Sequence, residues 1–108
     1  MGPHLLAEAR SVAYHQAVAE RLRQDPALLE VARQRVRGWV EVGTPAGYYA
    51  RAWEEILAMP LDEIIEVMTA SDERACALRQ VTPFAGFIPP SERWRLWREV
   101  RARYSENP

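Results

Sequence analysis

The sequence contains no lysine and a single cysteine, and it has no long hydrophobic run. All 14 basic residues are arginine, whose planar guanidinium suits bidentate bonds to carboxylates and stacking on aromatic rings. One cysteine, Cys76, cannot form a disulfide within the chain, which excludes a disulfide-stapled secreted scaffold. The longest uncharged stretch, residues 80–91, has 12 residues with three prolines, so no segment is expected to cross a membrane.

Length, composition and charge are those of an ordinary globular chain. Of its 108 residues, 48% are hydrophobic and 27% are charged, which argues against disorder. We expect one domain with one core, over residues 5–105. Residues 1–4 are interpreted as an expression tag or a disordered end, and no signal segment follows, so a cytoplasmic protein is expected. The net charge of -1 provides no overall attraction to nucleic acid.

The spacing of apolar residues predicts an all-α fold, a compact bundle of about six helices. A capping residue followed by proline marks helix starts at residues 25–26 and 44–45, and Gly43 marks a helix end. Ser71 and Ser91 are expected to cap the last two helices. The expected helices span residues 5–24, 26–42, 45–58, 61–68, 72–81 and 92–104.

Charge is unevenly distributed along these helices. Residues 54–73 carry seven acidic residues and no base, whereas residues 91–104 carry five arginines against two glutamates. We expect the acidic middle and the basic last helix to pack against each other or to face water.

The connection before the last helix, residues 82–90, contains three prolines and two phenylalanines. Its two phenylalanines and the two tryptophans that follow either close the core or form a patch of the kind that dominates protein interfaces. The expected mechanism inserts one of these phenylalanines with one tryptophan into a partner's groove. Arg79 and Arg93 flank the connection and are expected to orient it by bonding to its carbonyl oxygens. The expected partner-binding residues are Arg79, Gln80, Pro83, Phe84, Phe87, Arg93, Trp94 and Trp97.

Binding of nucleic acid is the alternative hypothesis. Arg95, Arg98 and Arg101 lie on the last helix with aromatic residues between them, a pattern that suits contacts to phosphates. The two helices within residues 61–81 have the lengths of a helix-turn-helix. Asp72 and Glu73 open the second of these helices, however, and would repel the DNA backbone.

Motifs of enzymes and metal sites are almost absent. The chain has no glycine-rich phosphate loop and no histidine or cysteine spacing typical of a metal site. His15 is the credible base for Cys76, but nothing in the sequence places the two together, and both are expected in structural roles. Asp62 and Glu66 share a helix face, where a solvated acidic surface is expected in preference to a metal pair. We therefore expect no enzyme, no cofactor and no metal.

Two short motifs stand out along the chain. Residues 78–86 read Leu-Arg-Gln-Val-Thr-Pro-Phe-Ala-Gly, and residues 91–94 read Ser-Glu-Arg-Trp. With these motifs, and with segments 13–19, 48–53 and 61–63, the chain resembles a family of small uncharacterised bacterial all-helical proteins. The resemblance implies an association with toxin–antitoxin loci, in proteins that stand alone or follow a helix-turn-helix domain. It implies no catalytic residue.

These patterns predict a non-enzymatic helical module for protein interaction, an antitoxin-like component that binds a partner protein. Ten aromatic residues are many to cover in 108, so self-association, for example as a symmetric dimer, is also expected. A regulator that binds nucleic acid through the last helix is the alternative.

Overall fold

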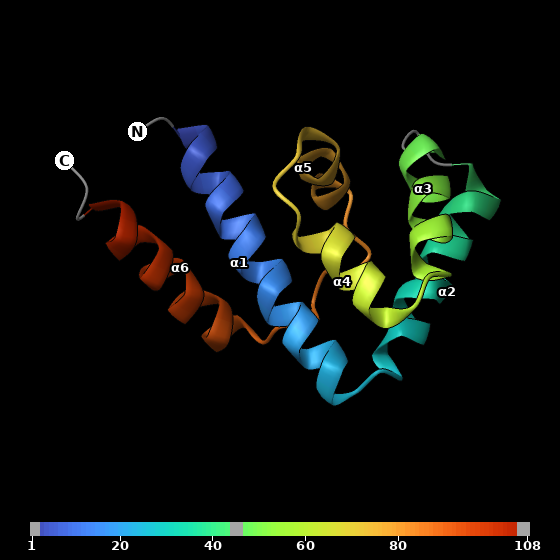
Figure 1. Cartoon of the computed structure of the whole chain (residues 1–108), viewed down its shortest axis with the longest axis horizontal. Coiled ribbons are helices and arrows are strands. Elements are labelled where there is room, and N and C mark those ends of the chain that lie inside the picture. The colour runs from blue at the N-terminus through green and yellow to red at the C-terminus, as the bar shows by residue number, and fades with distance from the viewer. Residues whose placement is uncertain (1–2, 44–46, 106–108) are drawn as a thin grey trace.

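The chain folds into helices joined by short connections, seen here in a computed structural model (Figure 1). The structure describes residues 3–43 and 47–105, and these ranges contain six helices and no strand. The predicted all-α fold is therefore confirmed. The helices are α1 (Pro3–Gln24), α2 (Leu28–Val42), α3 (Gly47–Leu57), α4 (Leu61–Thr69), α5 (Glu73–Gln80) and α6 (Pro90–Ser105).

The ends of α2 follow from local sequence. The backbone N–H of Leu28 donates to the carbonyl of Asp25 at 3.1 Å, so the chain makes a tight turn first and α2 begins two residues after the expected Pro26. Gly43 ends the helix as expected, with a φ of +68° that favours glycine. The helix start expected at residues 44–45, like the first two residues of the tag interpretation, lies outside the described residues.

The starts of α5 and α6 differ from the sequence prediction. Asp72, not Ser71, is the residue that precedes α5. Helix α6 begins at Pro90, so Ser91 lies inside its first turn and does not cap it. A proline suits the first helical position because its missing N–H has no partner there in any helix.

Helix α1 lies in the middle of the molecule. In Figure 1, α6 runs antiparallel to it on one side, and α4 lies on the other side with α5 next to it. Helices α2 and α3 form a hairpin at the far end, where α3 meets α4. Helix α6 therefore packs mainly on α1 and leaves much of its surface to solvent. None of the helices within the described ranges is both long enough and apolar enough to span a bilayer.

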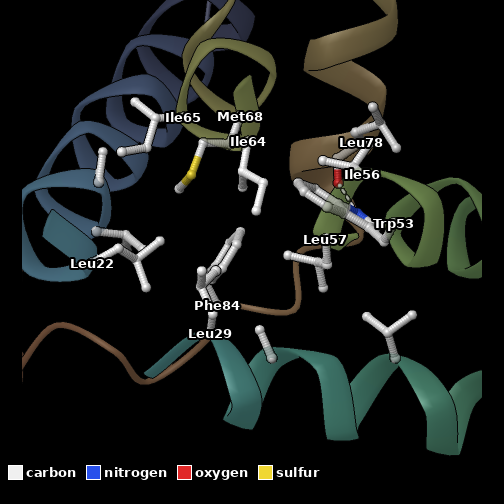
Figure 2. Close-up of a cluster of buried hydrophobic side chains, with 14 of the residues drawn as sticks. Leu22, Leu29, Trp53, Ile56, Leu57, Ile64, Ile65, Met68, Leu78 and Phe84 are labelled. Carbon is white, nitrogen blue, oxygen red and sulfur yellow. Dashed lines mark hydrogen bonds between the residues drawn. The ribbon is translucent and has the colours of Figure 1, made fainter. Parts of the chain in front are cut away.

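A continuous hydrophobic core joins α1, α2, α3, α4 and α5 to the connection before α6. Figure 2 shows the ring of Phe84 rising from that connection between Leu22 of α1 and Leu57 of α3. The same ring meets Trp53 edge-on, with the two centroids 5.6 Å apart. Burying an apolar side chain of this size contributes about 1.5–3 kcal/mol, so these residues dominate the stability of the fold.

We expected the acidic middle and the basic last helix either to pack against each other or to face water. They do not pack against each other. Helix α1 lies between α6 and α4 (Figure 1). Asp62 of α4 pairs with Arg23 of α1 at 2.9 Å, and Glu92 of α6 pairs with Arg21 of α1 at 3.5 Å. Most other charges of α4 and α6 face water.

Candidate functional site

The connection before α6, residues 81–89 in the structure, is largely built into the core, one of the two roles that the sequence left open for it. Phe84 has no exposed surface, and Pro83 is also buried. Phe87 and Trp97 are half-buried and pack against the core, and Arg93 is half-buried as well. Insertion of Phe84 into a partner's groove therefore does not fit this structure, because the protein itself covers the ring on all sides.

Hydrogen bonds from α1 hold the backbone of this connection. The hydroxyl of Tyr14 donates to the carbonyl of Phe84 at 2.6 Å. The N–H of Phe84 donates to the hydroxyl oxygen of Thr82 at 3.1 Å, which closes a local turn. A second turn follows, in which the N–H of Phe87 donates back to Phe84 at 3.2 Å and Gly86 has the φ of +80° that a type II turn requires.

His15 of α1 is a further contact to the connection before α6, and its surroundings determine its protonation state. Its Nδ1 lies 2.7 Å from the carbonyl of Ser11, which can only accept, so Nδ1 carries a proton. Its Nε2 lies 2.9 Å from the Thr82 hydroxyl, which donates to the neutral ring. The pKa of His15 is lowered to about 4, because burial and, to a smaller extent, the nearby positive charge of Arg79 outweigh the raising effect of the Ser11 bond. The ring is therefore neutral at pH 7.

Arg35 of α2 is a fixing residue that the sequence analysis missed. Its Nη1 donates to the carbonyls of Pro83 at 3.0 Å and Ala85 at 2.6 Å. Its guanidinium also lies over the ring of Phe87, 5.2 Å from the centroid. It fills the role that the sequence assigned to Arg79 and Arg93. No local signal could have found it, because the contacts join residues about 50 positions apart.

Arg79 has a different structural role from the expected one. It is only 3% exposed, and its Nη1 donates to the carbonyls of Met68 at 3.3 Å and Ala70 at 2.5 Å. These carbonyls close the end of α4, so Arg79 ties α5 to α4. Its Nη2 lies 3.4 Å from the sulfur of Cys76, while its Nε has no partner among the described residues.

Cys76 lies with Glu8 and Arg79 beside a groove of about 470 Å³ between α1, α5 and α6. Its thiol donates to the carboxylate of Glu8, and this bond raises the pKa of Cys76 above its usual range. The thiol is a poor nucleophile at neutral pH as a result. The structure does not join Cys76 to His15 by a hydrogen bond, the arrangement that a nucleophile and its base need.

Among the aromatic residues predicted to bind a partner, Trp94 is the exposed one, with 65% of its surface accessible to solvent. Trp94, Arg98 and Arg101 are spaced by four and three residues, so they form one strip along α6, which we call the α6 flank. Both arginines are exposed, and neither forms an ion pair with any described residue. The helix directs Val100 into the core and places Glu99 on the side away from the flank.

The other predicted residues are dispersed. Arg95 is exposed and pairs with Glu92 of its own helix at 3.8 Å. Gln80 is exposed at the end of α5, away from the helix that carries the flank. The structure thus brings together one residue of the protein-binding set and two of the nucleic-acid set.

A second surface feature is a groove of about 340 Å³ where α4 meets α5, here called the α4–α5 groove. Its apolar lining is accompanied by acidic side chains and one arginine. It is lined by Met59, Glu63, Glu66, Val67, Ala70, Asp72, Arg74, Ala75 and Leu78. The sequence had suggested only a solvated acidic face here, because the apolar lining comes from two different helices.

Among the side chains that the structure describes, no group of three could hold a metal ion. Comparison with protein-family models, with curated proteins and with solved structures finds no match to this chain.

Proposed function

We propose that this protein is a non-enzymatic helical module that binds a partner protein through the α6 flank, as an antitoxin-like component would. The observation that carries the proposal is Trp94, a large apolar side chain that is 65% exposed on a rigid helix. Isolated exposed apolar residues are common, but this one lies in line with two arginines that lack an acidic partner among the described residues.

The flank has the chemistry of an interface hot spot. Tryptophan and arginine are the residues that most often carry binding energy at protein interfaces. The indole suits an apolar pocket, and each guanidinium can form a bidentate pair with a carboxylate. The partner surface is therefore apolar at its centre and acidic beside it. Helix α6 needs no rearrangement to present this flank, which lowers the entropic cost of binding.

Pull-down from nuclease-treated lysate, with the wild-type chain and matched variants as bait, tests the proposal. Trp94→Ala and Arg98→Glu are expected to lose the captured protein. Tyr48→Ala and Arg51→Glu are the controls, because Tyr48 is also an exposed aromatic residue (71%) and Arg51 an exposed arginine, both on α3. Circular dichroism should show equal helical content in all four variants.

The comparison between variants decides the outcome. A protein captured by the wild type and both controls but not by the flank variants supports the proposal. Equal capture by all baits, or no specific capture, contradicts it.

Nucleic-acid binding is the second candidate, favoured by the same two unpaired arginines beside a tryptophan on which a base can stack. It predicts an affinity for DNA or RNA that falls steeply with salt, and a shallower salt slope for Arg98→Gln and Arg101→Gln. A titration that shows no binding at low salt would remove this candidate.

A further inference from the structure

The α4–α5 groove has the opposite character to the α6 flank. Glu63 and Glu66 are exposed at its rim, and neither pairs with a basic residue among those described. Asp72 adds a third acid, against the single base Arg74. Val67 and Leu78 contribute apolar lining from α4 and α5. This combination suits an amphipathic helix that carries arginines beside an apolar side chain.

The spacing of charges also agrees between the two surfaces. Arg98 and Arg101 are three residues apart on α6, and Glu63 and Glu66 are three residues apart on α4. Each pair therefore spans about 4.5 Å along its helix axis. An exposed apolar side chain accompanies each pair: Trp94 lies one turn before the arginines on α6, and Met59, in the connection before α4, lines the groove with Glu63. Two such surfaces laid side by side match base to acid and apolar to apolar.

One molecule cannot make this match within itself. Helix α6 is packed on α1, which lies between α6 and α4 (Figure 1). Among the described residues of a single copy, Arg98, Arg101, Glu63 and Glu66 consequently have no ion-pair partner. A second copy can supply what each surface lacks.

We propose that the α4–α5 groove binds the α6 flank of a second copy of this chain. The inference rests on the proposed function in one respect, that the α6 flank is an interaction surface. It adds a regulatory consequence, because a flank held in the groove of another copy is not free for a partner protein. Self-association and partner binding therefore compete.

Complementary charge reversal tests the proposal on the full chain. Arg98→Glu with Arg101→Glu makes both surfaces acidic, and Glu63→Arg with Glu66→Arg makes both basic. Each double variant alone should associate about tenfold more weakly than the wild type in sedimentation equilibrium, because like charges then face each other. An equimolar mixture of the two should recover association, because each acidic surface then meets a basic one.

Controls and milder variants keep the test decisive. Glu54→Arg with Glu55→Arg on α3 is the matched control and should associate as the wild type does. If a reversed variant loses helical content, Arg98→Gln with Arg101→Gln and Glu63→Gln with Glu66→Gln replace it, with a smaller loss expected. A wild-type chain that stays monomeric at every concentration overturns the proposal. A mixture that fails to associate, or reversed variants that associate like the wild type, overturns it equally.

Failure here and failure of the proposed function are distinguishable. The Glu63→Arg and Glu66→Arg chain should still capture the partner protein, and more of it than the wild type does, because its own α6 flank is free. If the wild type is monomeric but captures a partner, the proposed function is supported and only the binding of the α4–α5 groove to a second copy is contradicted. If the wild type self-associates but captures no partner, the groove proposal is supported and the proposed function is contradicted.

Discussion

His15 is buried, so its ionisation affects the stability of this fold. Its ring is buried and bonded in the neutral form to Ser11 and Thr82. The pKa of His15 is about 4 in the folded chain, against an ordinary value of 6.5, so between these values the unfolded chain binds more protons. The free energy of unfolding should therefore fall as the pH drops from 6.5 to 4, by roughly 3 kcal/mol, and stay constant with respect to this group above pH 6.5.

Urea denaturation of the wild type and of His15→Gln across this pH range measures the effect. The variant serves as the control, because every other titratable group is common to both chains. The difference between the two curves should change between pH 6.5 and 4. A constant difference over that range would contradict the assignment of a neutral, buried His15.

Phe84 and Phe87 lie three residues apart in the same connection but differ in role. Phe84 is fully buried against the rings of His15 on α1 and Trp53 on α3, whereas Phe87 is half-buried. Phe84→Ala should lower the free energy of unfolding by about 3–5 kcal/mol, the usual cost of a large cavity. Phe87→Ala should cost clearly less. Chemical denaturation of both variants measures the two losses, and equal losses would show that Phe87 is as much a core residue as Phe84.

At the scale of elements, the connection at residues 81–89 is held by helices distant in sequence. Arg35 of α2 provides two of its hydrogen bonds, to the carbonyls of Pro83 and Ala85. Arg35→Ala should reduce the free energy of unfolding by about 1–3 kcal/mol, because both carbonyls lose a charged donor. Arg37→Ala is the matched control on the same helix, where the arginine's ion pair among the described residues is with exposed Glu30. Thermal unfolding that shifts equally in both variants would contradict the anchoring role.

Helix positions were largely predictable from local pattern. Apolar residues recur at helical spacing along α2 and α4, and Gly43 can adopt the positive φ that ends α2. Both signals lie within one or two helical turns of sequence. The helix starts were less predictable, as Asp72 and Pro90 show. Capping preferences there differ by only about 1 kcal/mol, and tertiary packing exceeds such differences.

At the scale of the whole molecule, opposite charges are displayed on separate surfaces of a nearly neutral chain. The net charge is -1, yet Arg98 and Arg101 lie on one surface and Glu63 and Glu66 on another. Association between copies should therefore weaken several-fold as salt rises from about 0.1 to about 1 M, where the Debye length falls from about 10 to about 3 Å. Sedimentation equilibrium over a salt series measures this. Association that strengthens with salt would indicate a purely apolar contact instead.

The candidate site was harder to predict than the fold. The sequence included Trp94, Arg98 and Arg101 among its candidate residues, but it placed them in two competing sets. It could not rank Phe84 against Trp94, since both are aromatic residues near prolines. Their exposures, 0% and 65%, depend on which elements lie over them.

By itself, the sequence determined that this chain is helical, roughly where its helices lie apart from several of their starts, and that it has neither a disulfide within the chain nor an apolar run long enough to cross a membrane. These properties follow from composition and from periodicity within a few residues. Only the tertiary structure decided that α6 packs on α1, that Arg79 is buried, and that basic and acidic surfaces remain apart. Such outcomes depend on contacts between residues far apart in the chain, whose energies no local pattern contains.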